Sequence, residues 1–344
     1  MPTAETSAGS TLRAALDEVR QALRADIERG AGGRDALERH ASRVDALLAE
    51  LYVDARVPDR PVAIIALGGY GRRHLSLHSD IDLLLLFGGR IGAAEERFLR
   101  AFLHPLWDVG VVVGHQVREI DEFADLEIDN PEFLLALLDA RLVAGTPALF
   151  DRLQSMFHTP STHAYIVTSL LSLVDARHAQ FNDTLYQLEP DVKEAPGALR
   201  DVMAARTIAA LTDPLLLQRG PADPGRFEEA EEFLFRVRSV IHLEAGRNNN
   251  VLSHELQERV ADLLGYTGAE PHHRVERLMS DYFRHARIVS RTLGWASRTA
   301  RVMAISSCTR SPRNRSLAAR NPSSRRRARS SMRVAASRRS PRLA

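Results

Sequence analysis

The residues best suited to chemistry lie between residues 66 and 87, where the chain reads ALGGYGRRHLSLHSDIDLLLLF. An apolar run is followed there by a turn with three glycines, Gly68, Gly69 and Gly71. Because glycine has no side chain, such a turn can bring backbone N–H groups close to phosphate oxygens. Asp80 and Asp82 follow two residues apart on a predicted strand, so that both carboxylates point to one face. They can share a divalent cation, Mg²⁺ or Mn²⁺.

The order of these features makes the motif specific. A glycine pair alone is usually just a turn, and an Asp-x-Asp pair alone is usually solvated. Two charged residues that open an otherwise apolar strand need a partner. A cation bound by them would bridge the phosphates of a nucleotide, activate an attacking oxygen and offset the charge on departing pyrophosphate. The sequence therefore predicts a metal-dependent triphosphate site.

A second candidate is the charged stretch 186–201, YQLEPDVKEAPGALRD. Lys193 is the only lysine among the 46 basic residues of the chain. An ammonium is compact where a guanidinium is broad and planar, so its retention in an arginine-rich chain favours a phosphate or active-site role for Lys193. A solvated loop is the alternative interpretation.

The elements around these motifs fall into two groups. Short apolar runs predict buried strands at residues 62–67, 81–87 and 111–117. Helical spacing of apolar residues predicts helices in the first 107 residues and then almost continuously after about residue 130, where strand signals disappear. The predicted helices are 12–27, 37–48, 93–107, 133–142, 165–181, 199–217, 227–243, 256–264 and 275–293. A small α/β unit followed by a helical region is expected.

Composition narrows the class of protein. Of 344 residues, 44% are hydrophobic and 26% charged, which is typical of globular chains. No 18-residue apolar run is present, so a membrane span is not expected, and the single cysteine, Cys308, fits a cytoplasmic setting. Residues 304–344 contain 12 of the 46 basic residues and no acidic ones, which leaves 34 basic against 44 acidic residues before them. A nucleic-acid partner is therefore not expected of the body.

The two motifs together resemble a known family. The GGYGR…SDIDLLLLF stretch looks like the nucleotidyltransferase domain of the DNA polymerase beta-like superfamily, specifically that of the bifunctional PII uridylyltransferase/uridylyl-removing enzymes. The stretch 186–201 is similar to that family's YxLEPNVKEGPGGLRD, and residues 233–246 and 275–287 resemble its later helices. The resemblance covers roughly residues 35–295.

The resemblance implies an α+β fold, with a small mixed-sheet nucleotidyltransferase domain (56–145) between N-terminal helices (1–55) and an all-α domain (146–300). It implies transfer of UMP from UTP to a tyrosine of the PII signalling protein. Asp80 and Asp82 would be the catalytic residues and metal ligands. A further set would bind the nucleotide: Gly68, Gly69, Gly71, Arg72, Ser79 and Lys193. Adenylyl transfer from ATP and a catalytically inactive PII-binding fragment stay open.

The sequence departs from the family pattern at several positions. His74 stands where the family has an acidic residue, Leu77 where it has proline, and Ala195 and Ala198 where it has glycines. The superfamily's third carboxylate is not evident in VVVGHQVRE and is not assigned. His115 lies in the neighbourhood, where it fits a structural role better than that of a ligand, and Glu119 lies just beyond.

The end of the chain raises a separate expectation. Residues 301–344 form an Arg/Ser-rich stretch without periodicity, for which we expect disorder and which a frameshift could have produced. The HD and ACT domains of the resembled enzymes are expected to be absent from this chain, and with them removal of uridylyl groups and a response to glutamine.

Overall fold

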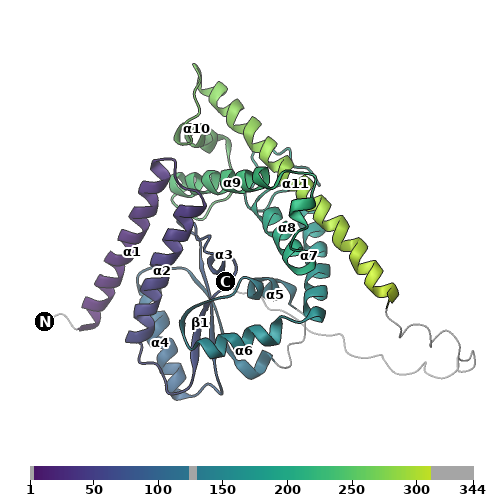
Figure 1. Ribbon diagram of the computed structural model, residues 1–344. Coiled ribbons are helices and arrows are strands. Elements are labelled where there is room, and N and C mark those ends of the chain that lie inside the picture. Colours follow the sequence, from purple (N-terminus) through teal and green to yellow (C-terminus); the bar gives the residue numbers. More distant parts are fainter. Residues whose placement is uncertain (1–3, 124–129, 311–344) are drawn as a thin grey trace, which may run out of the picture. The chain divides into compact units, whose positions relative to one another are not determined.

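The computed structural model describes residues 4–123 and 130–310. Met1–Met303 form one compact unit. Within it, a four-stranded sheet lies next to a group of helices (Figure 1). None of the helices in the described ranges is both long and apolar enough to cross a membrane.

The sheet has the order β3-β2-β1-β4 and is mixed. Its inner strands β1 (Val62–Ala66) and β2 (Ile81–Phe87) pair antiparallel, and β2 pairs parallel with β3 (Val113–Glu119). All of β1 is buried, and so is all of β2 except Asp82. This burial explains why both inner strands read as nearly continuous apolar runs. The predicted α+β class with a mixed sheet is confirmed.

The fourth strand was not expected. The sequence predicts a helix over 133–142 and no strand after residue 130, whereas helix α5 (Pro131–Leu138) ends early and β4 (Arg141–Gly145) pairs antiparallel with β1. Every residue of β4 is half-buried, because it lies at the sheet edge, so its five residues show no alternation. Gly145 has φ +101°, and a Cβ there would be 2.2 Å from the Val62 carbonyl oxygen.

Helices cover both faces of the sheet. Leu83 and Leu85 pack with α2 (Arg34–Asp54) and α4 (Ala93–Asp108). Leu84 and Leu86 face the opposite side, where α5, α6 (Pro147–Phe157) and the short η1 (Ile120–Phe123) lie. Alternation along β2 therefore directs Asp82 to the same side as Leu84 and Leu86.

The remaining helices pack on a second core. They are α7 (Pro160–Gln180), α8 (Leu199–Thr212), η2 (Leu217–Arg219), α9 (Pro224–Ala245), α10 (His254–Leu263) and α11 (Pro271–Arg310). α8 stops at Thr212, before the predicted residue 217, because Pro214 restricts Asp213 to an extended conformation. α6 is a helix that the apolar spacing did not single out.

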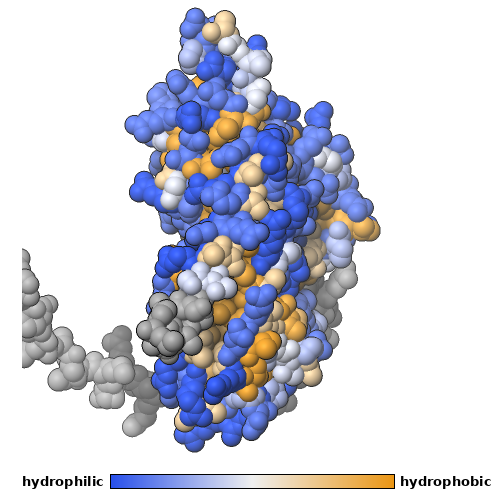
Figure 2. All heavy atoms as spheres, turned by 90° about the vertical axis from the view of Figure 1, so that its left-hand side faces the viewer, coloured by the Kyte–Doolittle hydropathy of each residue, from blue (hydrophilic) through white to orange (hydrophobic). Residues whose placement is uncertain are grey.

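Helix α1 (Ala4–Glu28) belongs to both cores. Its Leu12 and Leu16 pack with the sheet, whereas Leu23 and Ile27 pack with the helical region. α1 runs alongside α2, and Figure 2 shows that the side of the molecule on which α1 lies is mostly hydrophilic. The N-terminal helices thus connect the sheet to the helical region.

The end of α11 differs from the expected boundary of the tail. The helix runs to Arg310, ten residues into the stretch 301–344 for which the sequence predicts disorder. Ala300 is still buried and residues 302–305 read VMAI, which continues a helix readily. The rest of the predicted tail, 311–344, lies outside the described residues.

A buried ion pair joins α2 to the helical region. The Glu231 side chain on α9 is fully buried, and its Oε2 accepts hydrogen bonds from Arg34, at the start of α2, and from Arg206 on α8. The backbone N–H of Arg34 also donates to Glu232 Oε2 at 2.9 Å. Removing one member of such a group leaves the others buried and unpaired.

We therefore expect Glu231→Gln to lower the free energy of unfolding by about 2 kcal/mol, because two arginines lose their common carboxylate but remain partly hydrated. Urea denaturation measures the change. Glu228→Gln, an exposed site on the same helix, is the matched control and should stay within about 0.5 kcal/mol of the parent. Equal losses in the two variants would contradict this role for Glu231.

Candidate active site

The glycine turn forms the short helix α3 (Gly68–Gly71) directly after β1. The Leu67 N–H donates to the Asp82 carbonyl oxygen at 3.0 Å, which joins the turn to β2. Gly68 has φ +52°, a conformation that favours glycine. Gly71 packs so tightly that a Cβ there would be 2.0 Å from the Asp139 carbonyl oxygen. These two glycines are required for different reasons: one by backbone angle and one by close packing.

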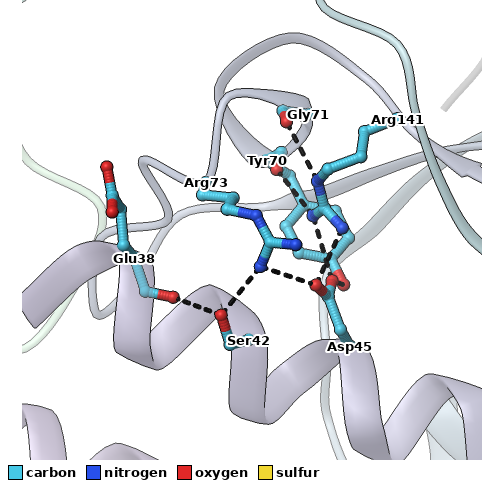
Figure 3. A network of polar contacts seen from close by, with 7 residues as sticks. All are labelled: Glu38, Ser42, Asp45, Tyr70, Gly71, Arg73 and Arg141. Carbon is cyan, nitrogen blue, oxygen red and sulfur yellow. Dashed lines mark hydrogen bonds and ion pairs between the residues drawn. The ribbon is translucent and has the colours of Figure 1, made fainter. Parts of the chain in front are cut away.

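A polar network fixes the turn from two sides (Figure 3). Asp45 on α2 accepts a hydrogen bond from the Tyr70 hydroxyl at 2.6 Å and two from Arg141 on β4, at 2.8 and 3.0 Å. Arg141 also donates to the backbone carbonyls of Gly71 and Tyr70, at 3.1 and 3.2 Å. Arg73 adds a second cation to Asp45 at 3.2 Å. Burial and the nearby Asp45 carboxylate raise the pKa of Tyr70, so its hydroxyl stays a donor.

Asp80 and Asp82 lie at the start of β2 beside this turn. Asp80 immediately precedes the strand, and Asp82 pairs with Gly114 of β3. A Cβ at Gly114 would lie 2.4 Å from Asp82 Oδ1, and one at Gly68 would lie 4.0 Å from Oδ2. Glycines thus leave room around the Asp82 carboxylate on both sides. Partial desolvation and the Asp80 charge raise the pKa of Asp82.

Two cations of the distant stretch 186–201 act electrostatically on this carboxylate. The charges of Lys193 and Arg200 lower the pKa of Asp82, against the larger effects of burial and of Asp80. Burial, Arg238 and Arg200 lower the pKa of Lys193 itself. Glu194 lies between the two cations, 3.7 Å from Lys193 Nζ and 3.2 Å from Arg200 Nε. The site therefore combines two exposed carboxylates with two cations whose charges favour the ionised form of Asp82.

The loop that carries Lys193 is held rigidly. Asp191 Oδ1 accepts the backbone N–H groups of Lys193 and Glu194, at 2.8 and 2.7 Å. Asp201, fully buried, accepts the Gly197 N–H at 2.7 Å and a bond from Arg177 at 2.6 Å, and also contacts His178. A buried carboxylate with three partners fixes the end of the loop from which α8 begins.

The departures from the family pattern fit without strain. Ala195 and Ala198 are fully buried, and neither is among the non-glycine residues with positive φ in the described ranges. Gly197, which the chain retains, has φ +80° and lies where a Cβ would be 2.5 Å from the Ala286 carbonyl oxygen. Leu77 is buried in the helical core.

His74 replaces an acidic residue in a basic environment. Its ring lies 4.6 Å from that of Phe235 between centroids. Burial and the charges of Arg72, Arg34 and Arg206 lower the pKa of His74 to about 3. The imidazole is therefore neutral at ordinary pH and adds no charge to these arginines.

Three of the predicted nucleotide ligands have other partners in the structure. Arg72 pairs with Asp139, at the end of α5. The Ser79 hydroxyl accepts a hydrogen bond from Arg238 at 3.3 Å. The Gly71 N–H donates to the Leu67 carbonyl oxygen at 2.9 Å. Lys193 also has a partner, Glu194 at 3.7 Å, although this distance is long for a direct hydrogen bond.

Neither candidate for a third carboxylate reaches Asp82. His115 projects to the opposite face of the sheet, where its ring lies 5.7 Å from that of Trp107. Glu119 accepts the Ile91 N–H at 2.8 Å at the far end of β3. In the described part of the chain no group of three or more His, Cys, Asp or Glu side chains could hold a metal. The Asp80 and Asp82 pair still fits Mg²⁺, which binds through one or two carboxylates together with substrate phosphates and water.

Two arginines near the site were not predicted as site residues. Arg200 was noted only as part of a charged stretch, and its position opposite Asp82 depends on how α8 packs. Arg238 lies on the buried face of α9, with Leu234 and Ile241 one turn away on either side. The sequence did contain a signal for Arg238, because an arginine on an otherwise apolar helix face indicates a buried cation.

The fold brings together the parts that the sequence predicts for a nucleotidyltransferase domain: a glycine turn and an Asp-x-Asp pair on a small mixed sheet, next to a helical region. Residues 167–295 match the family model described as GlnD PII-uridylyltransferase. The resemblance seen in the sequence is thus confirmed, and the chain carries a domain of this family.

Curated relatives extend the match over most of the chain. It is 33% identical to a bifunctional uridylyltransferase/uridylyl-removing enzyme of Ectopseudomonas mendocina, across 80% of this chain and 32% of the relative. The enzymes of the same name from Thiobacillus denitrificans and Azotobacter vinelandii are 35% and 34% identical, across 81% and 78% of this chain and 34% and 31% of theirs. The chain spans about a third of the length of these relatives.

The two closely spaced glycines make a matched test of the turn. Gly71→Ala should lower the free energy of unfolding by about 2 kcal/mol or more, because its Cβ would overlap the backbone of Asp139. Gly69→Ala should change it by less than about 0.5 kcal/mol, since the nearest atom to its Cβ is 3.8 Å away. Thermal and urea unfolding measure both. A Gly71→Ala protein as stable as the parent would refute the packing role.

Proposed function

We propose that this chain transfers UMP from UTP to a tyrosine hydroxyl of a PII signalling protein and releases pyrophosphate. The observation that carries the proposal is the glycine turn directly before Asp80 and Asp82 at the start of β2, in a chain whose helical region, with Lys193, matches the family model. The names of the relatives support uridylyl transfer. In the reaction, the tyrosine oxygen bonds to the α-phosphorus while the bond to the bridging oxygen of pyrophosphate breaks.

Each half of the site has a distinct task. Asp80 and Asp82 would hold Mg²⁺ or Mn²⁺, which supplies charge neutralisation for the phosphates and the leaving pyrophosphate when bound. Lys193 and Arg200 present positive charge to the triphosphate from the other side. Burial and the charges of Arg238 and Arg200 lower the pKa of Lys193, so an anionic phosphate would favour its charged form on binding.

The glycine turn completes the phosphate site. Its internal hydrogen bonds are donated by the N–H groups of Gly71, Arg72 and His74. The N–H groups of Gly68 and Gly69, at the start of the turn, are the ones directed to the triphosphate. The side-chain network around Asp45 keeps this arrangement in place before substrate binds.

Replacing the metal-binding carboxylates tests the reaction directly. Asp80→Asn or Asp82→Asn should reduce pyrophosphate release from UTP, in the presence of Mg²⁺ and a PII protein, by at least ~100-fold. Asp151→Asn, an exposed site on α6, is the control and should behave like the parent. Full activity in either site variant contradicts the mechanism. Faster turnover with ATP would favour adenylyl transfer, and PII binding without turnover by the parent would favour an inactive binding protein.

The requirement for a lysine rather than an arginine is separately testable. Lys193→Arg should lower kcat/KM for UTP by about 10-fold, although the charge is kept, because the broader guanidinium must fit beside Arg238 and Arg200. Arg259→Lys on the surface of α10 is the charge-preserving control. Steady-state kinetics with varied UTP measure the effect. Parent-like kinetics in Lys193→Arg would mean that Lys193 has no part in nucleotide binding.

A further inference from the structure

Arg238 is a buried arginine whose partners are all uncharged. Its side chain extends from the middle of α9, and the residue is 7% exposed. Nε donates to Asn250 Oδ1 at 2.8 Å, Nη1 to Ser76 Oγ at 2.8 Å and Nη2 to Ser79 Oγ at 3.3 Å. In the ranges that the structure describes, its guanidinium has no carboxylate within ion-pair distance.

This pattern is unusual for the molecule. Other arginines in buried or half-buried positions pair with a carboxylate, as at Glu231, Asp201 and Asp45. Burial lowers the pKa of Arg238 to about 10, so the protein keeps a cation there at a cost in stability. A neutral side chain of similar size at position 238 would fill the same space without that cost. A role beyond packing is therefore indicated.

The two serines that Arg238 contacts lie at either end of one turn. The Ser79 N–H donates to the Ser76 carbonyl oxygen at 3.0 Å, which closes the turn, and Asp80 follows directly. One helical turn further along α9, the ring of His242 accepts the His78 N–H through Nδ1 at 3.3 Å. Helix α9 thus holds the turn by both serine hydroxyls and by its backbone.

The third partner connects Arg238 to the other half of the site. Asn250 accepts from Arg238 through its side chain, and its carbonyl oxygen accepts the Val192 N–H at 2.8 Å. Val192 immediately precedes Lys193. One guanidinium therefore lies between the backbone segment that carries Asp80 and the one that carries Lys193.

We infer that Arg238 is a positioning residue: by fixing the Ser76–Ser79 turn it holds the Asp80 carboxylate beside Asp82, where both bind one divalent cation. The inference rests on the metal-binding part of the proposed function. Direct phosphate binding is not the role assigned here, because Arg238 is only 7% exposed and three of its five N–H donors already have acceptors. Arg238 acts through the two serines.

Binding of Mn²⁺ alone, followed by the electron paramagnetic resonance signal of free Mn²⁺, tests this without nucleotide or acceptor. We expect Arg238→Met to weaken Mn²⁺ binding about 10-fold and the double variant Ser76→Ala/Ser79→Ala to weaken it by a similar factor. The triple variant should bind no more weakly than Arg238→Met. Arg238→Lys should be intermediate, since one ammonium cannot span both serines and Asn250.

A control separates positioning from stability. Arg206→Gln removes an arginine from Glu231 in the same helical region, and should lower the urea midpoint while leaving Mn²⁺ affinity unchanged. Parent-like Mn²⁺ binding in folded Arg238→Met overturns the inference. The inference is also overturned if the arginine and serine changes act independently, so that together they weaken Mn²⁺ binding about 100-fold in the triple variant.

The serine variant decides the matter if Arg238→Met does not fold. Parent-like Mn²⁺ affinity in Ser76→Ala/Ser79→Ala would then overturn the inference, and a loss of affinity would support it. A parent that binds Mn²⁺ but releases no pyrophosphate from UTP refutes the proposed function while leaving this inference standing. A parent that binds no Mn²⁺ overturns both.

Discussion

Asp80 and Asp82 lie at the start of β2, a strand that is otherwise buried, so their negative charge must be compensated by groups outside that strand. The rest of the molecule is arranged around this constraint. β2 has no polar side chain after Asp82. Glycines on both sides leave the Asp82 carboxylate free, and the cations that face it come from a loop more than a hundred residues later. The sheet supplies the two carboxylates of the site, and the helical region supplies Lys193 and Arg200. The site therefore needs both parts of the molecule.

The scaffold that holds this arrangement is built from carboxylates, each shared by several hydrogen-bond donors. Asp45 fixes the glycine turn, Asp201 fixes the loop that carries Lys193, and Glu231 attaches α2 to the helical region. The basic residues of the chain are almost all arginines, and a planar guanidinium can donate more than one hydrogen bond to the same carboxylate. Lys193 and Arg238 stand apart from this pattern, one by residue type and one by its neutral partners.

Some changes that look disruptive in the sequence are harmless in the fold. Ala195 and Ala198 occupy positions with negative φ and enough space for a methyl group, whereas Gly197 between them does not. His74 stacks on Phe235 as a neutral ring. What matters at each position is the local backbone angle and the distance to the next backbone, and residue type alone does not report either.

The sequence by itself determined the inner strands, the helical region and the order of the glycine turn and Asp-x-Asp pair, because buried strands and amphipathic helices leave periodic apolar patterns. It could not determine β4, a five-residue edge strand that is half-buried throughout and so shows no pattern. Tertiary packing alone decided that Arg72 pairs with Asp139, that His115 faces away, and that Arg238 lies between the Ser76–Ser79 turn and Asn250. Contacts between distant segments depend on how whole elements pack, which local spacing does not encode.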